Sequence, residues 1–137
     1  IIENTWHRNP ASRTSFEWNV TLEGIELQHG NGNPPYVIPW PIFQSIFQQA
    51  QVLAQVNGNV VIAGTNQSDP SSGSVGEWVL QQGFMLSTGL LTPRHLSFIG
   101  PILGRMGFIT RQLNGNSIHW VFLSTYGRDL RGEFLLK

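Results

Sequence analysis

Residues 92–109 read TPRHLSFIGPILGRMGFI, and this stretch describes one helix from its cap to the strand that follows it. Thr92 is a favoured N-cap residue, and Pro93 suits the first helical position, where no hydrogen bond needs its missing N–H. Large apolar residues then recur at spacings of three, four and three, at Leu96, Ile99, Leu103 and Met106. Gly107 ends the helix, and an apolar strand begins directly after it.

Two strand-like runs follow this helix and are joined by a turn signal. The runs cover residues 108–113 and 117–122, and Asn114-Gly115-Asn116 stands between them. Asn-Gly between apolar runs favours a tight antiparallel turn. We therefore expect a two-stranded hairpin over residues 108–122.

Three further elements are expected before residue 92. Residues 41–55 place apolar side chains at spacings of three and four among glutamines, which predicts an amphipathic helix. Residues 60–63 form a short apolar run rich in β-branched side chains, which predicts a strand. Ser74 and Glu77 occupy the N-cap and N3 positions of a capping box, so a second helix begins there, and we expect it to end near residues 87–89.

The two ends of the chain have different patterns. Residues 1–15 are polar and aperiodic, which is typical of an arm. Residues 16–22 and 25–27 alternate apolar and polar side chains on either side of a Glu23-Gly24 turn signal, which predicts a β-hairpin. The tail of residues 124–137 is amphipathic and fits either a helix or a strand.

From residue 41 onward the expected order is helix, strand, helix, helix, strand, strand, and this order resembles the winged helix-turn-helix superfamily. Residues 103–109, LGRMGFI, resemble that family's junction between the recognition helix and the first wing strand. The expected fold class is therefore α+β, with a winged helix-turn-helix core over residues 41–123. The arm and β-hairpin of residues 1–40 would pack on this core, and residues 124–137 would form a C-terminal tail.

Two features depart from the family's pattern. Gly100 and Pro101 stand in the middle of the helix, and Pro101 has no N–H to donate to the carbonyl of Ser97, which predicts a kink. The loop of residues 65–74 is also long for the scaffold.

The resemblance implies a DNA-binding module of a transcription regulator or of another DNA-acting protein, with double-stranded DNA as its partner. The helix at residues 93–106 would lie in the major groove with its N-terminal residues nearest the bases. The wing at residues 108–122 would contact phosphates or the minor groove. The residues that would then contact DNA are Arg94, His95, Ser97, Arg105, Arg111, Asn114 and Asn116.

The charge is small in amount and unevenly divided. Charged residues make up 12% of the chain, with eight basic and eight acidic, against roughly 25% in an average soluble protein. Residues 1–70 carry two basic and five acidic side chains, whereas residues 71–137 carry six basic and three acidic. This division favours a basic face that belongs to the second half of the chain.

Residue types that several other functions need are missing. The chain has no Cys, which excludes disulfides, thiol catalysis and Cys-ligated zinc. Its four histidines lie far apart in sequence, without the spacing of a metal site. Because no hydrolase, phosphate-loop, zinc-protease or dinucleotide motif occurs, we expect no enzyme activity, no metal and no cofactor.

The compartment and the extent of the protein follow from simple features. No apolar run approaches the roughly 18 residues of a membrane span, so we expect a soluble protein without a membrane partner. The absence of Cys suits a cytoplasmic location. The start at Ile1 rather than Met indicates a processed form or a domain of a larger parent chain.

Two other functions stay open. A protein–protein interaction domain would use Phe98 and Ile102, which form a second apolar stripe on the helix at residues 93–106. Packing against the N-terminal hairpin would explain the same stripe. A neutral ligand- or glycan-binding domain would explain the many Asn, Gly and aromatic residues. Of the tryptophans, we expect Trp40 at the surface and Trp18, Trp78 and Trp120 in the core.

Overall fold

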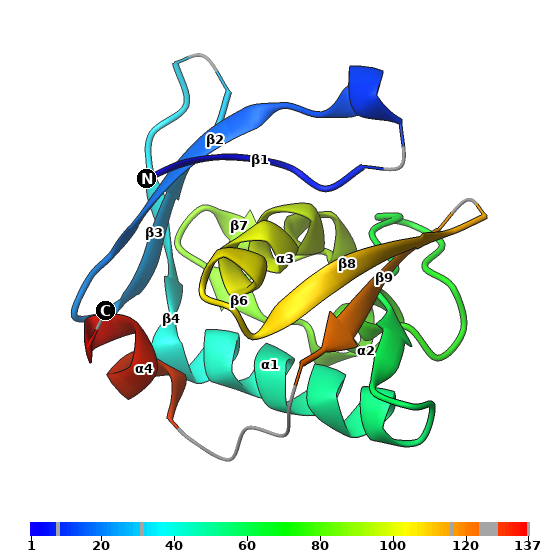
Figure 1. Ribbon diagram of the computed structural model, residues 1–137. Helices are drawn as coiled ribbons and strands as arrows, with labels where there is room; N and C mark the ends of the chain where they lie inside the picture. The colour runs from blue at the N-terminus through cyan, green and yellow to red at the C-terminus, as the bar shows by residue number, and fades with distance from the viewer. Residues whose placement is uncertain (8, 31, 116, 124–128, 137) are drawn as a thin grey trace.

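The N-terminal part of the chain forms an antiparallel sheet in the computed structural model, which describes residues 1–7, 9–30, 32–115, 117–123 and 129–136 (Figure 1). The strands lie in the order β1–β2–β3–β4, with the bounds Ile2–Asn4, Ser15–Val20, Gly24–Gln28 and Tyr36–Pro39. The alternation predicted for β2 is confirmed, because Phe16 and Trp18 are buried while their neighbours on the strand are exposed. The predicted hairpin is the middle of a larger sheet, since part of the expected arm pairs with β2 as β1, and β4 pairs with β3.

The elements of the second part lie where the sequence predicts them. They are α1 (Trp40–Gln55), β5 (Val60–Ile62), α2 (Val75–Gln82), α3 (Leu96–Arg105), β8 (Ile109–Asn114) and β9 (Ser117–Phe122). A short 3-10 turn, η2 (Pro93–His95), leads into α3, and another, η1 (Pro10–Ser12), lies between β1 and β2. The three strands form an antiparallel sheet in the order β5–β9–β8. The mixed α+β class is therefore confirmed.

Helix α2 ends earlier than its sequence pattern predicts. Ser74 caps its start as expected, because the Ser74 hydroxyl accepts the backbone N–H of Glu77 at 3.1 Å. Gly83 then adopts the left-handed conformation with φ 66°, which ends the helix. The chain continues into a small hairpin of β6 (Met85–Leu86) and β7 (Gly89–Leu90), so Leu86 is buried in a strand and not on the helix.

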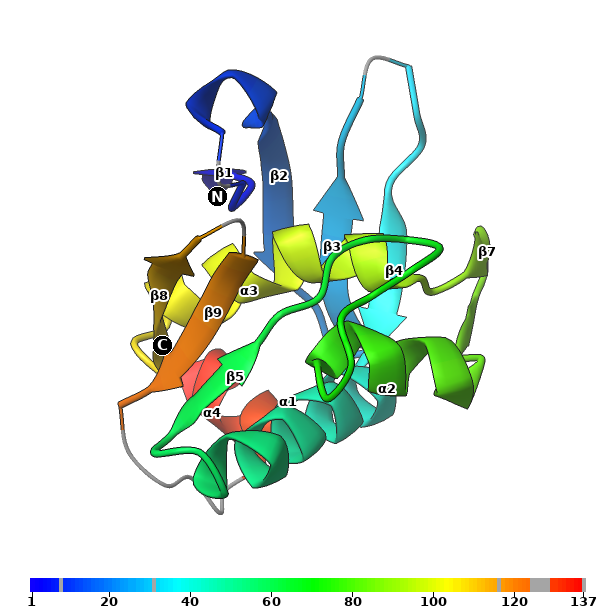
Figure 2. The same ribbon diagram turned by 90° about the vertical axis from the view of Figure 1, so that its right-hand side faces the viewer.

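Helix α3 lies in the centre of the molecule. Figures 1 and 2 show it with β1 and β2 on one side and α1 on the other. Every residue from Leu96 to Leu103 is buried, and α3 continues through Pro101 without a break. The Phe98 ring meets the Phe16 ring of β2 edge to face at 5.1 Å, so the second apolar stripe packs against the N-terminal sheet.

Two glycines allow Trp6 to lie directly on α3. A Cβ at Gly100 would come within 2.9 Å of Trp6 Cε3, and a Cβ at Gly104 within 2.7 Å of Trp6 Cζ2. Real Cβ atoms do not approach neighbours this closely. The Gly100-x-x-x-Gly104 spacing therefore makes a flat strip on one side of the helix, and the indole fills it.

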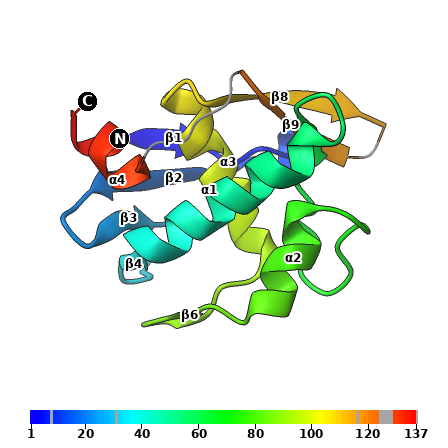
Figure 3. The ribbon, with the colours of Figure 1, turned by 90° about the horizontal axis from the view of Figure 1, so that it is seen from below.

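The C-terminal helix α4 (Leu130–Leu136) closes the core beside α1 (Figure 3). Its Phe134 is 2% exposed and sits in a cluster of four aromatic rings, from Trp18, Trp40, Phe43 and Phe108. The tail is thus helical over its described residues, while residues 124–128 and 137 lie outside them.

The burial of the tryptophan side chains differs from the prediction at one position, Trp40. Trp18 and Trp120 are buried as expected, and Trp78 is half-buried. Trp40 is also buried, and its Nε1 donates to the Thr21 carbonyl at 3.1 Å, so the expected surface position is wrong. The flanking prolines place Trp40 at the junction between β4 and α1, where the sheet and the helix both cover it.

Among the described residues, no helix has both the length and the apolar character that crossing a membrane requires.

Candidate functional site

Helix α3 offers no free face to a ligand as large as a DNA groove. Ser97 is 3% exposed, and its hydroxyl donates to the Arg94 carbonyl at 2.8 Å. His95 is half-buried, and its Nδ1 accepts the Thr92 backbone N–H at 2.9 Å as part of a capping box. The arrangement expected from the resemblance, with this helix in the major groove, does not fit the burial of residues 96–103, because β1 and Trp6 cover the outer side of the helix.

The same burial bears on the protein-contact function. Phe98 is 9% exposed and Ile102 is fully buried, so the two side chains do not form an exposed apolar stripe for a protein partner. The stripe that they form is internal packing, as the alternative explanation predicted.

Arg105 is exposed but already has a partner. Its Nη1 lies 3.0 Å from Glu3 Oε1, and the side chains are 54% and 21% exposed. This ion pair links α3 to β1 across the outer side of the helix. An ion pair this open to solvent contributes little to stability, about 0–1 kcal/mol. It does mean that Arg105, the basic residue in the last turn of α3, already has an anionic partner.

Two of the residues predicted to lie in a wing, Arg111 and Asn114, lie on the surface as expected. Arg111 and Asn114 are exposed on β8, which is an edge strand of its sheet. The Arg111 guanidinium carbon lies 5.9 Å from the centroid of the Trp6 ring, within the range of a cation–π contact. Asn116 lies outside the described residues.

Two exposed arginines, Arg13 after η1 and Arg111 in β8, line a depression with His7, and the charge of the exposed Arg94 in η2 acts on the same imidazole. We call these three residues the arginine cluster. Arg13 Nε donates to the His7 carbonyl at 3.4 Å. Arg13, Arg111 and His7 line one depression of about 260 Å³. Within the described part of the chain, none of the three arginines forms an ion pair with a carboxylate.

The pKa of His7 reports the local field. Burial lowers it, and the positive charges of Arg94 and then Arg13 lower it further. Asp69 lines with His7 a neighbouring polar depression of about 340 Å³. The field at His7 nevertheless disfavours a further positive charge, which makes this surface attractive to an anion.

Sequence patterns located two members of the cluster and missed the third. Arg94 and Arg111 are predicted site residues, whereas Arg13 and His7 fall in the segment that we interpreted as an arm. No local signal marks them, because only the pairing of β1 with β2 carries this segment across α3.

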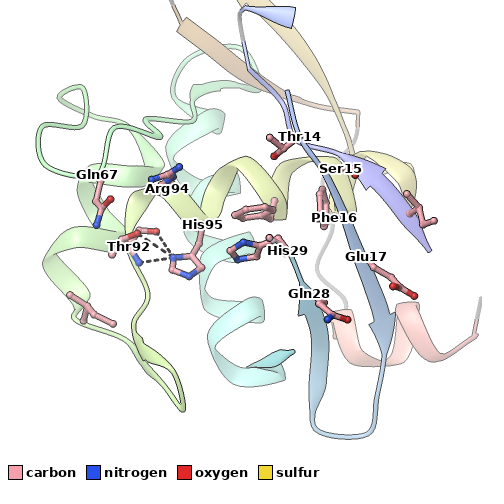
Figure 4. Close-up of a pocket in the computed structure, with 14 residues that line it drawn as sticks. Thr14, Ser15, Phe16, Glu17, Gln28, His29, Gln67, Thr92, Arg94 and His95 are labelled. Carbon is pink, nitrogen blue, oxygen red and sulfur yellow. Dashed lines mark hydrogen bonds between the residues drawn. The ribbon is translucent and has the colours of Figure 1, made fainter. Parts of the chain in front are cut away.

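A groove of about 1000 Å³ lies beside the cluster and shares Arg94 with it (Figure 4). One wall carries Arg94, Thr92 and Gln67. The facing wall carries Thr14, which precedes β2, together with Glu17 of β2 and Gln28 of β3. Aromatic rings form the floor of the groove. They are His29 and His95, which Figure 4 labels, and Phe98, which stacks on His29.

The rings of the floor are held in fixed positions. The His29 ring stacks on Phe98 with centroids 4.3 Å apart and planes 21° apart, and its Nε2 lies 3.0 Å from the Tyr36 hydroxyl. The Tyr36 ring meets His95 edge to face at 5.9 Å. Burial raises the pKa of Tyr36, so its hydroxyl stays protonated at neutral pH.

Both groove histidines are uncharged at neutral pH. Burial lowers the pKa of His29, and Arg94 lowers it further. Burial is also the main cause that lowers the pKa of His95, and it is partly opposed by the Thr92 backbone carbonyl, which lies 3.3 Å from Nδ1 and favours a protonated ring. The groove therefore has a neutral aromatic floor, one cation at the Arg94 end and one carboxylate, Glu17, at the far end (Figure 4).

Metal ligation is not built into the described part of the chain, where no three His, Asp or Glu side chains come together. Comparisons with protein-family models, with curated proteins and with solved structures found no match to this chain.

Proposed function

We propose that the chain is a DNA-binding domain on a winged-helix frame, and that it holds the phosphate backbone with the arginine cluster instead of reading bases with α3. The order α1–β5–α2–α3–β8–β9, interrupted between α2 and α3 by the β6–β7 hairpin and η2, and the sheet order β5–β9–β8 support the frame. The β8–β9 hairpin occupies the position of the wing and contributes Arg111.

The observation that carries the proposal is the convergence of Arg13, Arg94 and Arg111 around His7 without a carboxylate partner. The whole chain has a formal net charge of zero, so a local excess of three cations does not follow from its composition. Like charges repel one another, and a surface that gathers them favours a polyanion. Arginine binds phosphate oxygens well because its planar fork offers two parallel donors.

Such contacts predict a characteristic salt dependence. Each phosphate that a cation neutralises contributes about −0.9 to the slope of log K against log salt. Three arginines therefore predict a slope of about −3. Since phosphates carry no sequence information, the affinity should vary little among duplexes of different sequence.

The test is fluorescence anisotropy with a labelled duplex over a series of salt concentrations. The triple variant Arg13→Gln, Arg94→Gln, Arg111→Gln should lose most of the affinity and most of the slope, and each single variant should lower the slope by about 0.9. Arg131→Gln is the matched control, because this exposed arginine lies on α4, at the opposite end of the molecule from η1 (Figure 1). Duplex binding that is unchanged in the triple variant, with a normal thermal melt, would refute the proposal.

A further inference from the structure

The groove next to the arginine cluster has no role in holding a duplex backbone, yet its construction is that of a binding site. We infer that it takes an unpaired nucleotide, with the base on the aromatic floor and the phosphate at Arg94. This inference rests on the proposed function, because the nucleotide would belong to the nucleic acid that the arginine cluster holds.

The size and the floor fit such a ligand. The volume of about 1000 Å³ lies at the upper end of the range of small-molecule sites, roughly 300–1,000 Å³, and leaves room for a nucleotide with its neighbours. Aromatic side chains bind unpaired bases by stacking, which tolerates any base because each has a π face. His29 and His95 both line the groove and are half-exposed, so their rings border the space that a base would fill.

The floor is prepared before the ligand arrives. His29 is fixed by its stack on Phe98 and by its hydrogen bond with Tyr36, and His95 by its bond with the Thr92 backbone N–H. Rings that are already ordered lose little conformational entropy when a ligand stacks on them. Because both imidazoles are neutral, the floor also suits a neutral heterocycle better than a charged group.

The charges at the two ends determine the orientation. Arg94 stands at one end of the groove and Glu17 at the other, with His29 between them (Figure 4). A phosphate is attracted to Arg94 and repelled by Glu17, so the base must lie toward Glu17 and Gln28. Arg94 also belongs to the arginine cluster, so a strand whose phosphates lie along that cluster would pass one end of the groove.

The decisive probes are two short single-stranded oligonucleotides of equal length, one normal and one abasic, which share their phosphates and differ in their bases. The native chain should bind the normal strand on the order of 10-fold more tightly than the abasic strand, since one stacked base contributes about 5- to 150-fold. Equal affinities for the two strands would overturn the inference.

Two substitutions of one residue separate stacking from hydrogen bonding. His29→Gln can still bond to the Tyr36 hydroxyl but has no ring, so the preference for the normal strand should disappear. His29→Phe keeps a ring without that hydrogen bond and should keep the preference. His119→Gln is the control. Ile118 of β9 lines the depression of the arginine cluster, and the side chain of its neighbour His119 projects from the opposite face of the strand.

The outcomes of the two proposals are distinguishable. If the triple arginine variant binds both strands and the duplex as the native chain does, the proposed function fails. Suppose instead that the triple variant binds all three ligands more weakly by the same factor. If the preference for the normal strand is then absent, or survives His29→Gln, only the groove assignment fails. Binding of a neutral oligosaccharide that competes with the normal strand and ignores Arg94→Gln would assign the groove to glycans and overturn the inference.

Discussion

The packing of Trp6 on α3 can be tested by adding one methyl group at Gly104. The new Cβ would lie 2.7 Å from Trp6 Cζ2 and 2.9 Å from Cη2, so the indole must move. Overpacking of this kind costs about 1–3 kcal/mol. Replacing a helical Gly with Ala contributes about 0.8–1 kcal/mol in the opposite direction. Gly104→Ala should therefore destabilise the fold by about 0–2 kcal/mol.

Gly132 provides the matched control for this substitution. It lies in α4, and a Cβ there would meet nothing within 4 Å. Gly132→Ala should then stabilise the chain by up to about 1 kcal/mol. The difference between the two variants should be about 1–3 kcal/mol, or roughly 3–10 °C in melting temperature for a domain of this size.

The assay is chemical denaturation followed by tryptophan fluorescence, with a thermal melt as an independent measure. Trp6→Leu in the Gly104→Ala background should recover part of the loss, because the smaller side chain gives the methyl group room. Since Arg111 lies over the Trp6 ring, Gly104→Ala should also weaken duplex binding. If Gly104→Ala stabilises the chain as much as Gly132→Ala does, Trp6 does not lie on α3 and the buried position of this helix is wrong.

Three further predictions concern the site and the core. Binding of a duplex should raise the pKa of His7, because the phosphates offset the positive charges of Arg94 and Arg13 that help to lower it. The measurement is an NMR titration of the imidazole. A pKa that falls or stays constant would contradict the proposed position of the DNA backbone. The free energy of unfolding should decrease as the pH falls below about 6.5, the ordinary pKa of His. Burial lowers the pKa of His95 in the folded state, so the unfolded chain binds the proton more readily. The decrease should be smaller in His95→Gln, and identical pH profiles of the variant and the native chain would exclude His95 as a cause. Phe134→Ala should cost about 3–5 kcal/mol in chemical denaturation, because this buried ring fills a cluster of aromatic side chains; a loss below about 1 kcal/mol would show that α4 is not docked.

The local elements of the second part were predictable because their signals are local. Ser74 and Glu77 form a cap within one helical turn, and the turn between β8 and β9 includes Gly115, whose φ of 60° is in the left-handed region. The periodicity of α3 likewise predicted its buried stripe. These features depend on hydrogen bonds and side-chain spacing over a few residues, which a sequence displays directly.

The candidate site was predictable only in part. Arg94 and Arg111 are surface residues as expected, but Ser97 is buried and Arg105 is paired with Glu3, which lies 102 positions away in the chain. Chain distance of this order leaves no trace in a local pattern. The aromatic floor of the groove was missed for the same reason. His29 directly follows β3 and His95 lies in η2, and only the folded chain brings these two segments to one groove.

What the sequence determined by itself is the order of α1, β5, α2, α3, β8 and β9, without the β6–β7 hairpin, and the absence of the residue types that thiol and zinc–cysteine chemistry need. Only the tertiary structure decided that α3 is an internal helix. An apolar stripe predicts that one face of a helix will be buried, but it does not identify the segment that covers that face. The covering segment is the N-terminal sheet with Trp6, and its arrival both closes the outer side of α3 and brings Arg13 to Arg94 and Arg111. The physical reason is that hydrophobic burial has no direction of its own, so the partner of each apolar face is selected by the packing of the whole chain.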